Sequence, residues 1–571
     1  MKYGVFNYKE GEKMKLSGAQ IVLKTLKDLG VDVLFGYPGG AVIPLYDALY
    51  EVREDFTHVR TSHEQGAAHA ADGYARVTGK VGVCIATSGP GATNTVTGIA
   101  NAYMDSIPML VITGQVATNL IGKDSFQEID ITGVTIPITK HNYLVKDIQE
   151  LEDTLKKAYH VAQSGRPGPV LVDIPKDIFL TKVDYKEVDT DEFVDFVEGK
   201  IKNEDCYDEE LIEIIAEKIN NSKKPVIFAG GGVIISGNCD KLQELASKND
   251  IPVTNSLMGL GSISRKDRLS LGLLGMHGSR EANLAVHNSD LVLAIGARFS
   301  DRVIGKADSF AKNAKIIHID IDESEVCKNI GVDNYAVGDI GIILQKLIEC
   351  VDKKDRKEWL EEILNWRSNS KNSEEEFIPQ NIIKMASEKL GENAIVATDV
   401  GQHQMWTAQH WDFIEPKTFV TSGGLGTMGF GLGAAIGSQI GKPDKRTILV
   451  TGDGSFRMNC NELATVRKWN LPIIILLFNN SALGMVRQWQ RLFQDEKYSE
   501  TDMGDEVDYI KLAEAYHIDG YRVCDIESFE NVLEKVCKTN EPVLIECSLN
   551  KNACVFPIVP PGKPIDKLVT E

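Results

Sequence analysis

A short motif near residue 450 constrains the fold of this chain more than any other feature. Gly452-Asp453-Gly454 follows the apolar stretch 446–450, and Asn479-Asn480 comes 27 residues later, directly after the apolar run 471–478. The segment between them has the pattern of a helix. The unit therefore predicts a strand, a helix and a parallel strand, whose right-handed crossover brings both carboxyl ends to one edge of a sheet. A carboxylate, an amide oxygen and a glycine turn at that edge suit Mg²⁺ bound together with ligand phosphates.

Composition limits the classes of protein to which the chain can belong. Its 571 residues suffice for about three or four domains, and 43% hydrophobic and 25% charged residues are typical of a globular protein. The net charge of −20 disfavours a nucleic-acid-binding role. No apolar run approaches the roughly 18 residues of a membrane span.

Two further features predict a cytoplasmic protein. The first ten residues contain no apolar core of a secretory signal. The ten cysteines form no Cys-x-x-Cys pair, which favours reduced thiols over a disulfide framework or a zinc site.

Apolar runs alternate with helical patterns along nearly the whole chain. This alternation predicts an α/β fold of three consecutive doubly wound parallel-sheet domains. A C-terminal segment that contains four prolines is expected to lie across the surface without forming a helix. The predicted boundaries are an N-terminal tail at 1–14, a first domain at 15–182, a linker at 183–209, a central domain at 210–350, a charged linker at 351–378, a third domain at 379–549 and a C-terminal tail at 550–571.

The first domain contains an acidic residue at a predicted strand-to-helix junction. Glu64 lies in His-Glu-Gln-Gly-Ala-Ala-His-Ala-Ala-Asp-Gly-Tyr-Ala-Arg, residues 63–76, after a predicted strand. Taken alone, it can be a helix-start glutamate favoured by the helix dipole. The glycine-rich stretches 36–41 and 87–94 also follow strands and can be simple turns.

The third domain contains two more loops of interest. Residues 400–403 follow the predicted strand 394–398, and residues 422–429 contain a G-x-G-x-x-G pattern. That pattern alone would suggest a dinucleotide site. Met428, inside it, can be an ordinary core methionine.

Together these segments resemble the signature of thiamine-diphosphate (ThDP) enzymes, which explains residues 422–429 better than a dinucleotide site does. The resemblance implies that Glu64 hydrogen-bonds the cofactor's aminopyrimidine and so promotes loss of the proton at C2. It implies that Met428 supports the bent cofactor. The implied Mg²⁺ ligands are Asp453, the side-chain oxygen of Asn480 and the backbone carbonyl of Ala482. Besides Glu64, the implied ThDP contacts are Pro38, Gly91, Asn94, Val400, Gly401, Gln402, His403, Gly426, Met428, Gly452, Gly454, Ser455, Met458 and Met485.

More closely, residues from about 15 to 565 resemble the large catalytic subunits of the acetohydroxyacid synthase (acetolactate synthase) family. The segments that carry this resemblance are 35–41, 123–128, 165–170, 274–278, 296–303, 484–490 and 559–562. The first and third domains would then bind the pyrimidine and the diphosphate of ThDP. The implied reaction decarboxylates pyruvate and joins the hydroxyethyl group to a second pyruvate, giving 2-acetolactate, or to 2-oxobutanoate, giving 2-aceto-2-hydroxybutanoate. This is the first common step of valine, leucine and isoleucine synthesis.

The resemblance also assigns residues at the reaction centre. Gly40 and Gln127 would be catalytic, and Phe126 and Trp489 would contact substrate. Lys176 would lie at the entrance. Trp489 can instead be a helix residue that packs on the C-terminal tail, and Lys176 can be an ordinary surface lysine.

The central domain would bind FAD in a structural role, since the net reaction transfers no electrons. Without the resemblance, this domain could equally be an α/β layer with no cofactor. The implied FAD contacts are Arg166, Gly230, Gly231, Gly232, Leu274, Gly275, Met276, His277, Gly296, Arg298, Asp301, Arg302, Asp320 and Asp339.

By family analogy the active site lies between two subunits, with Glu64 from one and Asp453 from the other. A homodimer or tetramer and a small regulatory subunit are therefore expected, and no nucleic acid or membrane partner. The main alternative is an oxidoreductase of the pyruvate oxidase type, which uses ThDP and FAD. A simple 2-keto-acid decarboxylase and a non-catalytic scaffold are the others. Glyoxylate carboligase is disfavoured because it lacks a glutamate at the place of Glu64.

Overall fold

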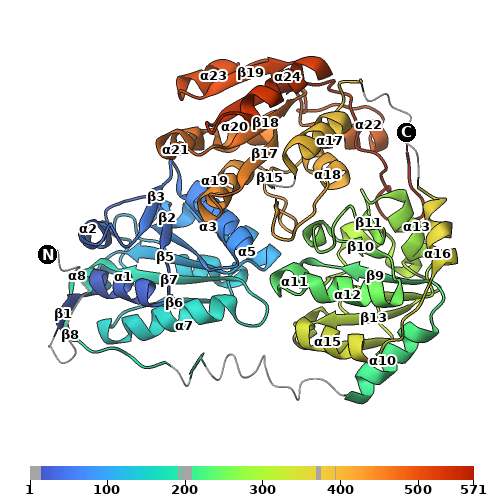
Figure 1. Ribbon diagram of the computed structural model, residues 1–571. Helices are drawn as coiled ribbons and strands as arrows, with labels where there is room; N and C mark the ends of the chain where they lie inside the picture. The colour runs from blue at the N-terminus through green and yellow to red at the C-terminus, as the bar shows by residue number, and fades with distance from the viewer. Residues whose placement is uncertain (1–13, 191–192, 195–208, 368–374, 392–393, 571) are drawn as a thin grey trace.

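Three six-stranded parallel sheets, with helices between successive strands, make up the protein (Figure 1). The computed structural model describes residues 14–190, 193–194, 209–367, 375–391 and 394–570. The expected α/β class is confirmed. The predicted N-terminal tail lies almost wholly outside the described residues, as do 195–208 and 368–374 of the two predicted linkers.

The first sheet has the strand order β3-β2-β4-β5-β7-β6. Strands β4 and β5 bury alternate side chains in two different hydrophobic clusters, as expected for a sheet covered by helices on both faces. A short antiparallel pair, β1 (Met14–Ser17) with β8 (Lys182–Tyr185), joins the two ends of this region. The strands are β2 Val33–Gly36, β3 Thr57–Arg60, β4 Gly82–Ala86, β5 Met109–Gln115, β6 His141–Leu144 and β7 Pro169–Pro175, and the helices are α1 Gly18–Asp28, α2 Ile43–Glu51, α3 Glu64–Thr78, α4 Pro90–Asn94, α5 Val96–Asp105, α6 Ile131–Thr135, α7 Leu151–Gln163 and α8 Lys176–Leu180.

The second sheet has the order β11-β10-β9-β12-β13-β14. Its strands are β9 Pro225–Ala229, β10 Val253–Asn255, β11 Ser270–Leu273, β12 Leu291–Ile295, β13 Lys315–Asp320 and β14 Asn334–Val337, and its helices are α10 Glu209–Asn221, α11 Gly231–Ile235, α12 Cys239–Asn249, α13 Arg280–Asn288, α14 Asp301–Ile304, α15 Ile340–Cys350 and α16 Lys357–Leu364.

The third sheet has the order β16-β15-β17-β18-β20-β19. The predicted unit of strand, helix and strand is present as β17, α20 and β18, and β17 pairs parallel with β18. The strands are β15 Ala394–Thr398, β16 Phe419–Val420, β17 Arg446–Gly452, β18 Ile474–Asn479, β19 Asp519–Val523 and β20 Val543–Ser548, and the helices are α17 Pro379–Leu390, α18 Gln402–His410, α19 Gly431–Gly441, α20 Asp453–Asn459, α21 Leu463–Trp469, α22 Gly484–Phe493, α23 Tyr509–Ala515 and α24 Ile526–Cys537.

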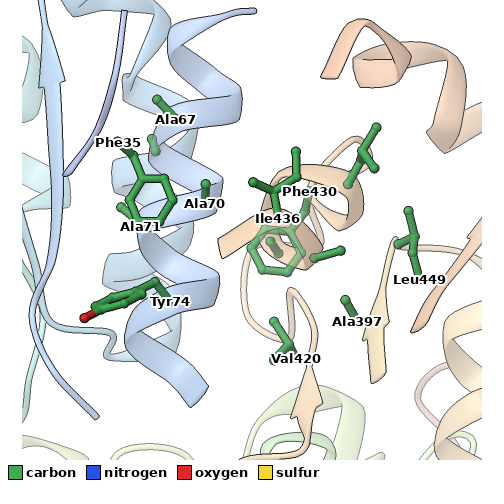
Figure 2. Close-up of a cluster of buried hydrophobic side chains, with 14 of the residues drawn as sticks. Phe35, Ala67, Ala70, Ala71, Tyr74, Ala397, Val420, Phe430, Ile436 and Leu449 are labelled. Carbon is green, nitrogen blue, oxygen red and sulfur yellow. The ribbon is translucent and has the colours of Figure 1, made fainter. Parts of the chain in front are cut away.

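The first and third sheets share one hydrophobic core, in which α3 packs directly on α19 (Figure 2). At the closest points the facing residues are glycine and alanine. A Cβ atom added at Gly437 would lie 1.8 Å from the carbonyl oxygen of Ala70, and one at Gly73 would lie 2.2 Å from the carbonyl oxygen of Ala434. The two backbones therefore approach more closely than any larger residue allows at these positions.

The C-terminal segment joins the third sheet region to the second. Val555 N–H donates to Gln488 Oε1 at 2.8 Å, and Val559 N–H donates to Met276 O at 2.8 Å. The segment contains no helix, as its prolines predict. Four of its apolar residues, Val555, Ile558, Val559 and Ile565, are nevertheless buried, because they fill the space between two domains. This part of the segment therefore does not lie across the surface as predicted.

Across the described parts of the chain, none of the helices has the length and apolar character that a membrane crossing requires.

Gly437→Ala is predicted to destabilise the protein by about 1–3 kcal/mol, because the new methyl group would overlap the backbone of α3. Urea unfolding measures this change. Gly331→Ala is the control, since a Cβ atom there meets nothing within 4 Å. Equal unfolding midpoints for the two variants would contradict the close contact of α3 with α19.

The buried His69 on α3 is predicted to make the stability of the folded protein sensitive to acid. Its ring lies edge-on against Phe430 at 5.2 Å, and burial lowers its pKa to about 3. Between about pH 6.5 and 3 the unfolded chain binds a proton that the native chain does not, so stability falls as pH falls through this window. His69→Met should make the slope of unfolding free energy against pH shallower by up to about 1.4 kcal/mol per pH unit. His141→Met, at an exposed histidine, should leave the slope unchanged, and equal slopes in all three proteins would refute this role of His69.

Candidate active site

A cavity of about 60 Å³ lies at the carboxyl edge of the third sheet. Strand β15 leads into the loop before α18, β17 leads into Asp453 at the start of α20, and β18 leads into Asn480. The structure thus brings together twelve predicted residues in the lining of one cavity. They are Val400, Gly401, Gln402, His403, Met428, Gly452, Asp453, Gly454, Ser455, Asn480, Ala482 and Met485. Gly426 and Met458 are outside this lining, and Met458 is exposed.

Asp453 is a desolvated carboxylate. The residue is 2% exposed, and burial raises its pKa to about 6. Its Oδ2 atom is buried without a hydrogen-bond partner among the described residues. Asn480 lies beside it in the cavity, where its Oδ1 accepts from Ala482 N–H at 3.1 Å. An unpaired buried carboxylate oxygen next to an amide oxygen fits a hard divalent cation.

His403 contributes a neutral imidazole to the same cavity. Burial lowers the pKa of His403 to about 3. The ring packs against Gly401 and Gly452, and its Nε2 atom has no partner among the described residues. This atom can therefore form a hydrogen bond with a ligand without adding charge to the site.

Asp399 organises the loops around the cavity. Its Oδ1 accepts from the backbone N–H groups of Gly429 at 2.8 Å and Gly431 at 3.0 Å, and its Oδ2 accepts from Thr451 Oγ1 at 2.9 Å. One carboxylate thus connects the end of β15 to the segment after Met428 and to the strand before Asp453. Sequence reasoning missed Asp399, although its place directly after a buried strand was a usable signal.

The predicted catalytic residue Glu64 lies at the start of α3, beside the glycine turn that follows β4. Its Oε2 accepts from Asn94 Nδ2 at 2.9 Å. A Cβ atom added at Gly91 would lie 2.6 Å from Thr87 Cγ2 and 3.2 Å from Glu64 Oε1, so the turn packs closely against both residues. Three predicted residues, Glu64, Gly91 and Asn94, therefore form one cluster in the first domain.

Residues 126–127 and the loop around Gly40 border this cluster. Gln127 packs on Gly89, whose added Cβ would lie 2.9 Å from Gln127 Cβ, and Phe126 is 89% exposed. Pro38 and Gly40 are exposed as well, and Lys176 is half-buried at the start of α8.

The two groups of predicted ThDP residues do not meet within the described chain. The cavity at the third sheet has no lining residue from the first domain, and the hydrogen bond of Glu64 stays within the first domain.

The predicted flavin residues lie mainly near the carboxyl edge of the second sheet. Arg166, from the first domain, pairs there with Asp322 at 2.9 Å and Glu325 at 2.7 Å. An added Cβ at Gly230 would lie 1.9 Å from Gly296 O, so these glycines are required for backbone packing whether or not a cofactor binds. The carboxylate of Asp339 caps α15 through Ile342 N–H, and Asp320 accepts from Asp322 N–H at 2.9 Å.

The remaining flavin candidates lie around the loops that follow β11 and β12. Leu274 and His277 are buried, Gly275 and Met276 lie between them, and Arg298 donates to Met104 O at 2.6 Å. Gly231 and Gly232 begin α11. The side chains of Asp301 and Arg302 are 82% and 62% exposed. Arg302 lies over the ring of Trp489 at 5.7 Å, so a predicted flavin residue and a predicted substrate residue contact each other.

Comparisons with known proteins show the family of the chain. Three models of thiamine pyrophosphate enzymes match: the N-terminal TPP-binding domain at residues 16–134, the central domain at 212–347 and the C-terminal TPP-binding domain at 399–547. The chain is 45% identical over 567 residues to the probable acetolactate synthase large subunit of Methanocaldococcus jannaschii, which covers 97% of this chain and 95% of that protein. It is 43% identical to the acetolactate synthase isozyme 2 large subunit of Escherichia coli K12, with 96% of this chain and 98% of that protein covered. The large subunit of Lactococcus lactis is 42% identical, with 98% and 97% covered.

The chain belongs to the acetolactate synthase large-subunit family of thiamine pyrophosphate enzymes. This confirms the predicted family and makes ThDP the cofactor expected at the two groups of site residues. The roles assigned to individual residues of this chain stay predictions.

Proposed function

We propose that this chain decarboxylates pyruvate and transfers the hydroxyethyl group to a second 2-keto acid. With pyruvate as acceptor the product is 2-acetolactate, and with 2-oxobutanoate it is 2-aceto-2-hydroxybutanoate. The observation that carries the proposal is the cavity of the third sheet, in which a desolvated Asp453 oxygen without a partner among the described residues lies beside Asn480. The chain's identity of 41–45% to acetolactate synthase large subunits supports the reaction class.

The residues of the chain would bind and orient the cofactor. Mg²⁺ would bind Asp453, Asn480 and the carbonyl of Ala482, and neutral His403 would hydrogen-bond the diphosphate. ThDP supplies the carbanion chemistry when bound. Glu64 would share a proton with the aminopyrimidine ring, and Asn94 would orient its carboxylate. Met428 faces the Asp453 loop, since its Cε lies 3.7 Å from the position of a Cβ at Gly454, and would set the bend of the cofactor.

A second subunit would complete the site. Large apolar side chains are exposed near both groups of ThDP residues, which is unusual for a surface that faces only water. They are Tyr37 and Phe126 from the first domain, and Leu425, Met458 and Val486 from the third. A homodimer that covers them would bring Glu64 of one chain to Asp453 of the other.

Structural FAD would bind at the carboxyl edge of the second sheet. One feature of this edge fits the group: the His277 Nδ1 atom is buried without a partner in the described chain. Arg166 would lie beside the flavin, where Asp322 and Glu325 orient it.

The names of the relatives contain the words "large subunit", and a small regulatory subunit is proposed on that basis. A cytoplasmic location is proposed from the cysteine pattern; the nine cysteines that the structure describes are free thiols.

Glu64→Gln is predicted to slow deuterium exchange at C2 of bound ThDP by about 100-fold or more, because an amide cannot take the proton that the carboxylate shares with the ring. Quenched-flow NMR measures this rate. Glu152→Gln, at a buried glutamate on α7, is the control and should leave the rate unchanged. Exchange in Glu64→Gln at the wild-type rate would remove Glu64 from the mechanism.

Purified protein with ThDP, Mg²⁺ and pyruvate should form acetolactate under anaerobic conditions without an electron acceptor. Adding 2-oxobutanoate should give the longer product, and the flavin spectrum should stay oxidised throughout. Formation of acetate with consumption of O₂ in air would instead identify a pyruvate oxidase.

A further inference from the structure

The loop that carries Met428 is fixed at its beginning by the first domain. Asp105, the last residue of α5, accepts from Gly423 N–H at 3.0 Å and from Gly424 N–H at 2.7 Å. Asn101 Oδ1, one turn earlier, accepts from Ser422 Oγ at 2.5 Å and from Thr427 Oγ1 at 3.1 Å. Residues 422–427 thus bind two side chains that lie more than 300 positions earlier in the sequence.

These side chains are themselves held in place by α3. Arg76 Nη2 donates to Asp105 Oδ2 at 2.9 Å and pairs also with Asp72. Asn101 Nδ2 donates to Asp72 Oδ2 at 3.0 Å. The side chains of Asp72 and Asp105 are both 0% exposed, and the Arg76 guanidinium lies over the Phe430 ring at 5.4 Å. The network is therefore buried and charge-assisted, and such hydrogen bonds allow little movement.

The loop has few other means to hold its shape. Gly423 and Gly424 have no side chains, and Gly426 adopts a positive φ of 72°. At its far end, Asp399 binds Gly429 N–H and Gly431 N–H. Met428 lies between these two fixed points. Gln404 Nε2 also donates to Ser422 O at 3.0 Å and Asn459 Nδ2 to Gly429 O at 2.6 Å, so loss of the Asp105 bonds would loosen the loop without releasing it.

We propose that Asp105 is a positioning residue of the cofactor site, which acts through Gly423 and Gly424 on Met428. The proposal rests on the proposed function and adds a residue that none of the predicted contacts includes. Asp105 is outside the lining of the Asp453 cavity, so it would act on the cofactor only through the loop. Its proposed effect is to keep the loop, and with it Met428, in one conformation. This matters for the rate, because displacement of a site residue by about 1 Å can slow a reaction about 100-fold.

Asp105→Asn and Asp72→Asn form a matched pair. Each replaces a fully buried carboxylate that pairs with Arg76, but only Asp105 accepts hydrogen bonds from the loop backbone. In Asp72→Asn, the new amide would still offer an oxygen to Asn101. We expect Asp105→Asn to slow C2 deuterium exchange of bound ThDP by about 10-fold or more, with the ThDP dissociation constant changed by less than about 3-fold. Asp72→Asn should change the exchange rate by less than about 3-fold.

Exchange at the wild-type rate in Asp105→Asn would overturn the proposal. Equal slowing in both variants would also overturn it, since loss of a charge beside Arg76 would then explain the effect. If Asp105→Asn fails to fold, Ser422→Ala, which removes only the bonds to Asn101 and to Thr427 N–H, should slow exchange by about 5-fold. Exchange at the wild-type rate in Ser422→Ala would then overturn the proposal.

Amide hydrogen exchange of residues 421–428 without cofactor separates this proposal from the proposed function. In Asp105→Asn one carboxylate oxygen becomes an amide nitrogen, so protection of Gly423 or Gly424 should fall, whereas in Asp72→Asn both should stay unchanged. Unchanged protection in Asp105→Asn would overturn the positioning role. A wild-type chain that does not bind ThDP would contradict the proposed function, and the protection measurement would still decide whether Asp105 holds the loop.

Discussion

The close contact of α3 with α19 is the constraint on which the arrangement of this protein depends. Glycine and alanine face each other, and at Gly73 and Gly437 there is no space for even a methyl group. The contact joins the first and third sheets into one core (Figure 2). It also determines where the site residues lie, because α3 begins at Glu64 and α19 begins directly after the loop of Met428.

This geometry separates the two groups of site residues in a single chain. The Asp453 cavity is lined, in the described chain, by the third domain alone, while Glu64 bonds to Asn94 in the first. Because α3 and α19 are in direct backbone contact, a small rotation within the chain cannot bring the groups together. The proposed homodimer would instead place Glu64 of one chain beside Asp453 of the other, and the exposed apolar side chains are the observation that supports this proposal.

The sequence predicts those parts of the fold and of the site that depend on residues close together in the chain. The motif at 452–454 and the asparagines at 479–480 predict two parallel strands with a shared carboxyl edge, and twelve of the predicted residues line one cavity there. Polar contacts between distant segments have no local pattern. Asp105 and Gly424 are 319 positions apart, so their hydrogen bond could not be predicted. Burial of the C-terminal segment was missed for the same reason, since its prolines indicate only that it is not helical. The glycines at 230–232 and 296 show that a sequence pattern can also suggest too much. They resemble a cofactor loop, but close backbone packing explains them without a cofactor.

Mixed dimers test the account most directly. Glu64→Gln and Asp453→Ala chains, each inactive alone, can be co-expressed in equal amounts. Random association then makes half of the dimers mixed. If each site takes Glu64 from one chain and Asp453 from the other, one of the two sites in every mixed dimer is intact. Activity should therefore reach about a quarter of the wild-type value. Activity no greater than the sum of the two parent variants would show that Glu64 and Asp453 act within the same chain, and would contradict the account.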